Sequence, residues 1–428
     1  MREFQKNLTN SFYALLSLPS TAMGFALSIQ ISALSWLLTT RYNLDISQVG
    51  IVWAAGPLAG IVGQVVIGVI SDRVWFWGGR RRPFIVVGGV LASLMLLALP
   101  NIDAIRSSLG IGSLMVVAIA IALTLDLAIN ISFNPTRSII ADVTPEGDPR
   151  TKGYTWMQTI SGFFGVLAYL IGAVAGNYAL IYLGAGLVLI FSIGPLLFIA
   201  EPRELAATSK DHASGRGGDG GTQWGQLGRI YIAHAFSWIG VQTMFVYIIA
   251  FIQQKMQFTS DAALQTGQVI SISFAILNTV GFLLPVPVLE PLARKIGRVR
   301  THMTAVGIMA AGYFCVAAAG STAFVLYMLM IVLGIGWASI VSLPFAIMTE
   351  KIDKARTGLF MGIFNLSVVI PQLLVSLVLG RVIRDADDKT IIFLISGVTL
   401  AVSSLIWLLV KDSSPVKSPS HDPAKAAS

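Results

Sequence analysis

Residues 114–137 read LMVVAIAIALTLDLAINISFNPTR, and this stretch decides the class of fold. Its first ten residues are all apolar, and an aspartate, two asparagines, a proline and an arginine follow within the next fourteen. About 20 mostly apolar residues are needed to cross the hydrocarbon core of a bilayer as a helix. Because lipid offers no partner for a free backbone amide, we predict that this segment is a membrane-spanning helix.

The rest of the chain has the same character. It has 428 residues, of which 55% are hydrophobic and 12% charged, whereas soluble domains carry about 25% charged residues. We predict an all-α integral membrane protein with no cleavable signal peptide. Its twelve predicted spans are residues 18–40, 48–71, 83–101, 112–135, 155–176, 178–200, 230–252, 266–290, 303–320, 322–348, 358–380 and 390–410.

The net charge of +8 is unevenly distributed between the connections. Of the 29 Lys and Arg residues, all but six fall at the termini or in the connections after even-numbered spans. The exceptions are Arg41, Arg106, Lys255, Arg381, Arg384 and Lys389. By the positive-inside rule, both termini are predicted to be cytoplasmic, in a cell inner membrane. This placement argues against a nucleic-acid partner.

The longest polar segment before the tail divides the chain into two sets of six spans. We predict an N-terminal half at 1–200, a flexible Gly-rich cytoplasmic linker at 201–229, a C-terminal half at 230–411 and a disordered cytoplasmic tail at 412–428. Repetition of such halves is typical of membrane transporters.

The connections after the second and eighth spans resemble each other. In DRVWFWGGRRR, Asp72 precedes Gly79 by seven residues, and in EPLARKIGRVR, Glu290 precedes Gly297 by seven. A carboxylate at the end of one helix can pair with arginines at the start of the next, and such pairs can lock one conformation. We therefore predict a cytoplasmic gate; the alternative is that Arg80, Arg81 and Arg82 only set the topology. The gate residues are Asp72, Arg73, Gly79, Arg80, Arg81, Glu290, Arg294, Gly297 and Arg298.

The fourth span has a polar face. Asp126 lies deep in the span, Asn130 is one turn further on, and Arg137 returns to the same face after three turns. Charges at that depth are costly and usually face a cavity or a partner. Pro135 is predicted to break or kink this helix. We predict that Asp126 binds a proton and substrate. The alternative for Asp126 is a structural role, hydrogen-bonded to a neighbouring helix. The alternative for Arg137 is that it anchors the cytoplasmic end of the helix.

Other spans carry amides, hydroxyls and indoles but few charges. This inventory suits a neutral, hydroxyl-rich ligand such as a sugar, although polar groups in spans often only join helices. His234 is predicted to be a packing or hydrogen-bonding histidine. Beside Asp126, Asn130 and Arg137, the candidate substrate-binding residues here are Gln158, Trp238, Gln242, Asn278, Trp337, Asn365 and Gln372.

Several kinds of chemistry have no support in the sequence. There is no Gly-rich loop followed by Lys and Ser or Thr, so ATP drive is not expected. With one cysteine, Cys315, no intrachain disulfide can form. We expect no enzyme activity, no metal site and no cofactor.

Three segments resemble one family. They are similar to segments of the sucrose and maltose proton symporters, especially the bacterial ones. The segments read GPLAGIVGQVVIGVISDRVWFWGGRRRPFI, DLAINISFNPTRSIIAD, and GIGWASIVSLPFAIM with GIFNLSVVIPQLLVS. These form a branch of the major facilitator superfamily close to the glycoside–pentoside–hexuronide transporters. The resemblance implies a fold of two six-helix halves. It also implies that Asp126 takes part in proton coupling and sugar binding, and that Arg137 is needed for transport.

Departures from the family pattern fall near the expected pocket. Ser28 stands where relatives have glutamine, Gln30 lies two residues later, and Phe133 and Asn134 replace a Gln–Gly pair. Ser28 and Gln30 are therefore also candidate substrate-binding residues, and the particular sugar is left open.

Together these features predict a monomeric proton-coupled symporter of a disaccharide such as sucrose or maltose, working by alternating access. A Na⁺-coupled glycoside carrier and a non-transporting sugar sensor or assembly factor on the same fold remain alternatives.

Overall fold

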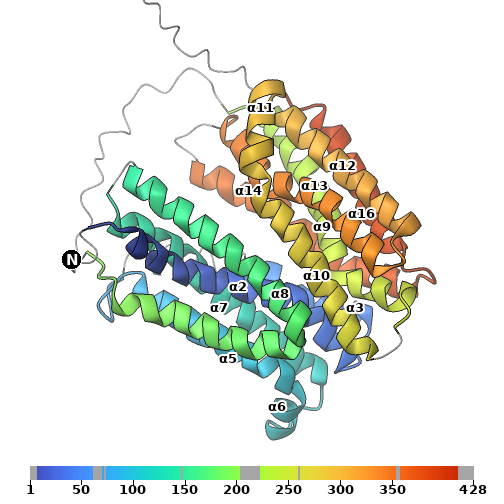
Figure 1. The fold of residues 1–428 in the computed structure, drawn as a ribbon, viewed down its shortest axis with the longest axis horizontal. Coiled ribbons are helices and arrows are strands. Elements are labelled where there is room, and N and C mark those ends of the chain that lie inside the picture. Colours follow the sequence, from blue (N-terminus) through green and yellow to red (C-terminus); the bar gives the residue numbers. More distant parts are fainter. Residues whose placement is uncertain are drawn as a thin grey trace, which may run out of the picture.

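The computed structural model describes residues 7–60, 70–71, 74–145, 148–202, 222–258, 261–352 and 357–412. The elements of its first part pack as one group, which we call the N-terminal bundle (Figure 1). They are α2 (Asn10–Thr40), α3 (Ile46–Trp53), α5 (Arg82–Ala98), the 3₁₀ turn η1 (Leu99–Asn101), α6 (Ile102–Ser108), α7 (Leu114–Val143), α8 (Asp148–Ile193) and the 3₁₀ turn η2 (Gly194–Leu197).

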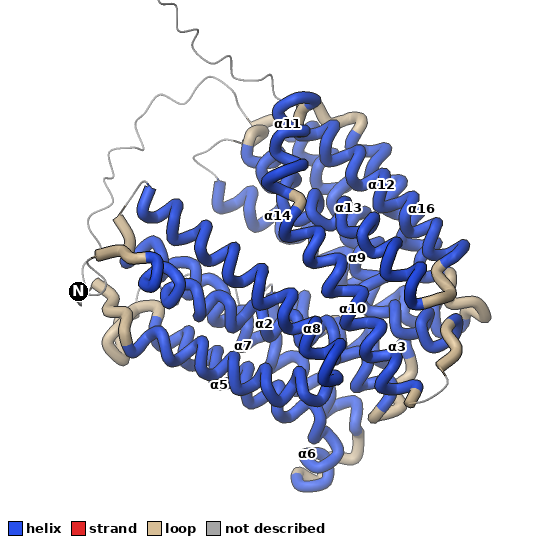
Figure 2. Tube along the Cα trace, viewed as in Figure 1, coloured by secondary structure: helices blue, strands red, loops and turns tan. Residues whose placement is uncertain are grey.

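The remaining helices form a second group, the C-terminal bundle (Figure 1). They are α9 (Trp224–Lys255), α10 (Ala262–Leu283), the π-helical turn η4 (Pro285–Leu289), α11 (Glu290–Ile296), α12 (Arg298–Ala319), α13 (Ala323–Thr349), α14 (Thr357–Leu374), the π-helical turn η6 (Val375–Leu379), α15 (Gly380–Asp385) and α16 (Ile391–Trp407). The prediction of an all-α fold is confirmed, and Figure 2 shows the connections gathered at the helix ends.

The predicted spans correspond to long apolar helices. Nine helices among the described residues are long and apolar enough to cross a membrane, and two shorter apolar ones are Ile46–Gly60 and Ile391–Trp407. One of the nine, Lys152–Leu197, contains the fifth predicted span and most of the sixth. They meet at Gly176, whose φ of +84° is accessible to glycine without strain. The second span continues into residues 61–69, outside the described part, so the count of twelve stays a prediction.

Local signals in the sequence explain several helix starts. The Thr9 hydroxyl accepts a hydrogen bond from the backbone N–H of Phe12 and caps α2. A capping box of Asp45 and Gln48 begins α3. Pro135, predicted to break or kink its span, lies inside α7, and the helix continues through it to Val143. The helix is therefore not broken at Pro135, and a kink there stays a prediction.

The two ends of the molecule differ in how closely the bundles meet. We call the end where α2 and α9 begin the linker end, and the end where they finish the far end. The bundles meet around α3 and α10 and diverge towards the end where α2 begins and where α11 lies (Figure 1).

Candidate functional site

A cavity of about 260 Å³ lies between the two bundles. Its walls come from α2 and α8 of the N-terminal bundle and from α10 and α13 of the C-terminal bundle. Its polar lining is made of hydroxyls, an amide and an indole, and its glycines leave room beside them. The lining residues are Gly24, Ser28, Ser161, Gly162, Gly165, Val166, Tyr169, Asn278, Gly281, Phe282, Trp337 and Val341.

The C-terminal wall of this cavity is organised around Trp337. Its indole Nε1 donates to the Asn278 side-chain oxygen at 3.3 Å, while the Asn278 amide nitrogen donates to the Phe274 carbonyl at 2.9 Å. The ring fits because Gly281 faces it: a Cβ on Gly281 would lie 2.7 Å from Trp337 Cδ1. Trp238 packs edge-on behind Trp337, at 6.1 Å between ring centroids. The result is a fixed aromatic face beside an amide.

Three predicted substrate-binding residues, Ser28, Asn278 and Trp337, line this cavity. Trp238 supports it through Trp337, and its own Nε1 donates to His234 Nε2 at 3.0 Å. His234 also stacks on Phe364, which fits the packing role predicted for it.

The other predicted residues of α8, α9 and α14 lie outside the cavity lining. Gln242 and Gln372 form a separate pair, with the Gln372 amide donating to Gln242 at 3.3 Å. Gln158 is exposed on α8, and Asn365 is half-buried on α14.

Asp126 lies in a second, separate place inside the N-terminal bundle. Its side chain is 4% exposed, and Gln30 Nε2 donates to its Oδ2 at 3.0 Å. Gly56 covers the carboxylate closely, because a Cβ there would lie 3.4 Å from both carboxylate oxygens. Asp126 is therefore buried, as predicted, and its side-chain partner is the neutral amide of Gln30.

Asn130 and Arg137 do not pair with the Asp126 carboxylate. The Asn130 amide donates to the backbone carbonyl of Asp126 at 2.8 Å, which is a bond within one helix. The Arg137 guanidinium lies over the ring of Phe133, 4.1 Å from its centroid. The interaction of a cation with the face of an aromatic ring is favourable. Phe133 is also one of the positions where this chain departs from the pattern of the sucrose and maltose symporters.

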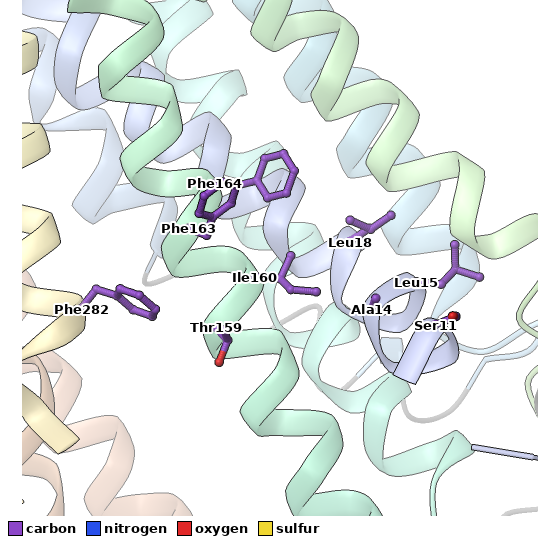
Figure 3. Close-up of a pocket in the computed structure, with 9 residues that line it drawn as sticks. All are labelled: Ser11, Ala14, Leu15, Leu18, Thr159, Ile160, Phe163, Phe164 and Phe282. Carbon is purple, nitrogen blue, oxygen red and sulfur yellow. The ribbon is translucent and has the colours of Figure 1, made fainter. Parts of the chain in front are cut away.

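A larger, apolar cavity of about 710 Å³ lies towards the linker end (Figure 3). It is bounded by the first turns of α2, by α8 and by Phe282, which projects from α10 towards α8. Phe282 also lines the smaller cavity, so its side chain contributes to the walls of both. A Cβ on Gly162 would lie 2.7 Å from Phe282 Cε2, so only glycine allows this ring its place.

Hydrogen bonds join the bundles at the far end. Ser32 on α2 and Ser271 on α10 are 2.7 Å apart between their hydroxyl oxygens, and Ser271 also donates to Asn177 at 3.3 Å. The Ser35 hydroxyl donates to the Val246 carbonyl at 3.1 Å, and Trp36 Nε1 donates to the Ala263 carbonyl at 2.6 Å. All these contacts are neutral and buried or partly buried.

Close backbone approach completes the far-end contact. Gly50 on α3 faces Tyr247 and the backbone of Ser376, where a Cβ would lie 2.5 Å from the Ser376 carbonyl oxygen. In the opposite direction, a Cβ on Gly380 would lie 3.1 Å from Ser47 Cα. Small residues of this kind allow membrane helices to approach closely. The bundles are therefore in contact at the far end, and they diverge towards the linker end (Figure 1).

The predicted gate residues form pairs within each bundle. Arg81 Nε lies 3.0 Å from Asp142 at the end of α7, and Arg81 Nη1 donates to Ser71 at 2.8 Å. Asp72 and Arg73 lie outside the described residues. In this state the Arg81–Asp142 pair braces the N-terminal bundle, and a gating role for it stays a prediction.

The C-terminal bundle has a corresponding pair. Arg298, at the start of α12, pairs with Glu350, which directly follows α13. Glu290 pairs with Arg294 one turn along its own helix, α11. In this state Glu290 does not reach the arginine of the next helix, because a nearer arginine lies on its own helix face, and a gating role for these residues stays a prediction.

Sequence reasoning missed two capping carboxylates. Glu201 accepts the backbone N–H groups of Arg80, Arg81 and Arg82 at 2.7–2.8 Å, at the start of α5. Asp412 likewise accepts the N–H of Val299 at 2.8 Å, at the start of α12. Gly79 and Gly297 stand directly against these carboxylates. Because Glu201 follows the sixth predicted span and Asp412 the twelfth, the internal repeat was a signal that could have identified them.

We expect Glu201→Ala to destabilise the protein. It removes an acceptor shared by three backbone donors and a negative charge from a helix N-terminus, a loss of about 0.5–2 kcal/mol. The melting temperature of the purified protein in detergent should fall by a few degrees. Glu290→Ala, which breaks an exposed pair within one helix, is the control and should change it much less. Equal melting temperatures for the two variants would contradict the capping role.

Comparison with known proteins agrees with this architecture. The sequence pattern of the Major Facilitator Superfamily matches residues 16–376. The chain is 25% identical over 426 residues to the sucrose transport protein SUC4 of Arabidopsis thaliana, covering 85% of this chain and 82% of that protein. It is 29% identical over 174 residues to a general alpha-glucoside permease of Schizosaccharomyces pombe, covering 36% and 31%.

Solved structures share the fold at low sequence identity. The nucleoside transporter NupG, as a D323A mutant, superposes with a TM-score of 0.74 at 13% identity, over 93% of this chain and 99% of that chain. The inward-open xylose transporter XylE from E. coli gives 0.71 at 16% identity, over 95% and 97%. The matched pattern covers most of the chain and the paired bundles agree with it: this multi-pass membrane protein belongs to the Major Facilitator Superfamily.

Proposed function

We propose that the protein is a proton-coupled symporter of a neutral glycoside, such as sucrose or maltose. The observation that carries the proposal is the pairing of two sites in one molecule. One is a cavity between the bundles lined by hydroxyls, an amide and an indole; the other is a buried acid, Asp126, with a neutral partner.

The cavity supports a sugar because its groups match sugar chemistry. The hydroxyls of Ser28, Ser161 and Tyr169 and the amide of Asn278 can donate to and accept from sugar hydroxyls. Trp337 offers a flat apolar face for the C–H surface of a ring. Relatives named for sucrose, alpha-glucosides and xylose point in the same direction.

The acid supports ion coupling because its charge is expensive where it lies. Burying an ionised carboxylate with one amide partner costs free energy that protonation removes. Asp126 is therefore proposed to take up a proton on one side of the membrane and to release it on the other.

The bundles are in contact at the far end and diverge at the linker end, and this asymmetry supports alternating access. If both termini are cytoplasmic, as the charge distribution favours, the far end faces outwards and this state is open to the cytoplasm. Transport then requires the far-end contacts to break and the bundles to close at the linker end.

The test uses purified protein in proteoliposomes with a pH-sensitive dye inside. We expect labelled sucrose or maltose to accumulate when the outside is acidic, and the addition of sugar at equal pH to carry protons inwards. Accumulation that follows a Na⁺ gradient and ignores the pH gradient would establish the Na⁺-coupled alternative. Binding of sugar without any uptake, in vesicles that hold folded protein, would favour the sensor.

A further inference from the structure

Helix α2 connects the cavity, the buried acid and the far-end contact within nine residues. Ser28 lines the cavity, Gln30 donates to Asp126, and Ser32 meets Ser271 of the opposite bundle. One turn further on, Ser35 and Trp36 donate to backbone carbonyls of that bundle. A small shift or rotation of α2 would therefore change the cavity wall, the contact with Asp126 and the far-end contact together.

The cavity and the acid are separated. Asp126 is absent from the cavity lining, its side chain is 4% exposed, and Gly56 lies against its carboxylate. Ser28, two residues before Gln30 on α2, faces the cavity instead. A sugar in the cavity does not need to touch the proton-binding carboxylate, so coupling needs a connection between them.

We propose that Gln30 is that connection: it is a positioning residue that transmits the charge state of Asp126 through α2 to the far-end contact between the bundles. The proposal rests on the proposed function. It assigns the sugar and the proton to separate sites coupled by α2, a helix of the N-terminal bundle that also contacts the C-terminal bundle.

The hydrogen-bonding chemistry of the pair explains how this works. An ionised carboxylate only accepts, so in that state it would take the Gln30 N–H in a charge-assisted bond; the structure places Gln30 Nε2 3.0 Å from Asp126 Oδ2, as such a bond requires. A protonated carboxyl group presents a donor, and its bond to a neutral amide is weaker. The ionised state therefore holds α2 where Ser32, Ser35 and Trp36 reach the opposite bundle, and protonation loosens that hold.

Few other charges surround this pair. Among the described residues, Gln30 is the only side chain that is seen to hydrogen-bond to the Asp126 carboxylate. Helix α2 has no Asp, Glu, His, Lys or Arg, and its titratable residue is Tyr13 at the linker end; α3 contains none. The other titratable groups of α7 and of the helices packed against it lie towards the bundle ends or on α8. They are Arg82 on α5, Asp103 and Arg106 on α6, and Arg137 and Asp142 on α7 itself. Those on α8 are Asp148, Arg150, Lys152, Tyr154, Tyr169, Tyr178 and Tyr182.

The test compares Gln30→Met with Ser32→Ala. Methionine keeps the length and flexibility of the side chain and removes the amide, whereas Ser32→Ala removes a far-end bond without touching Asp126. Spin labels at Arg41 and Ala262, both exposed at the far end, report the separation of the bundles in a Cys315→Ser background. Each protein is measured in nanodiscs at acidic and at alkaline pH, and sugar uptake and sugar exchange are measured in proteoliposomes.

The expected results differ in kind. The parent protein should open at the far end in acid. Ser32→Ala should be more open at every pH but should still respond to acid. Gln30→Met should lose the response to acid and about tenfold or more of its acid-driven uptake, while sugar exchange at equal pH continues.

Two results would overturn the inference. Each can be distinguished from a failure of the proposed symport function. A Gln30→Met protein that opens in acid as the parent does, with full acid-driven uptake, shows that Gln30 transmits nothing. Loss of sugar exchange together with uptake in Gln30→Met, with Ser32→Ala intact, shows that Gln30 serves the sugar instead. If the parent itself shows no acid-driven uptake, the proposed function is what fails.

Discussion

Asp126→Asn is expected to abolish uphill transport while leaving exchange of sugar across the membrane intact. Asparagine has nearly the same shape as aspartate and can still hydrogen-bond to Gln30, but it cannot bind and release a proton. An imposed pH difference of one unit is worth about 1.4 kcal/mol, or about tenfold accumulation of a sugar carried with one proton. The variant should reach only equal concentrations on the two sides.

Accumulation and counterflow of labelled sugar in proteoliposomes measure the two activities separately. Asp103→Asn is the matched control, since Asp103 is an exposed acid on α6 with a loose pair to Arg106 at 3.8 Å. It should accumulate sugar as the parent does. If Asp126→Asn still concentrates sugar in response to acid, another group carries the proton and Asp126 is a structural aspartate.

Much of this fold is contained in the hydropathy of the sequence. Apolar runs of membrane length predict the helices, because lipid leaves the backbone no alternative. The position of Asp126 inside such a run likewise predicted that it would be buried and would have a polar partner. These inferences need only the order of residues along one helix.

The partner itself needed the packing of helices against one another. Gln30 was assigned to the substrate, but it faces Asp126, while Ser28 faces the cavity. Which side of α2 meets α7 depends on the rotation of both helices, and this is set by contacts such as Gly56 against the carboxylate. A single sequence records the polar residues of a helix, not which of them point at one neighbour.

Pairing at the helix ends shows the same limit. Glu290 was expected to reach the next helix, and it instead meets Arg294 on its own, whereas Arg298 takes Glu350. Glu201 was read as the beginning of a linker, and it caps α5 more than a hundred residues earlier in the chain. Long-range partners of charged groups follow from the fold, so residues near one another in sequence are poor guides to them.

Gly50→Val is expected to prevent closure of the far end and so to reduce uptake strongly. The new side chain would overlap Tyr247 and the Ser376 carbonyl in the closed state, and a larger residue in a tight contact typically costs about 1–3 kcal/mol. Shifting an equilibrium by that amount changes the population of the closed state about 5- to 150-fold. Because sugar can leave towards the linker end only when the far end is closed, uptake should fall by a similar factor.

Accessibility of the cavity distinguishes this effect from misfolding. A cysteine placed at Val166, which lines the cavity, is labelled by a maleimide that cannot cross the membrane, in a Cys315→Ser background. From the far-end side, labelling should be about tenfold faster with Gly50→Val than without it. Gly186→Val on α8 is the control, since no atom lies within 4 Å of a Cβ there, and it should change neither labelling nor uptake. Equal labelling of the Gly50→Val protein and its parent, with uptake unchanged, would mean that α3 does not form the closing contact. The far-end seal would then depend on the contacts of α2 with α9 and α10.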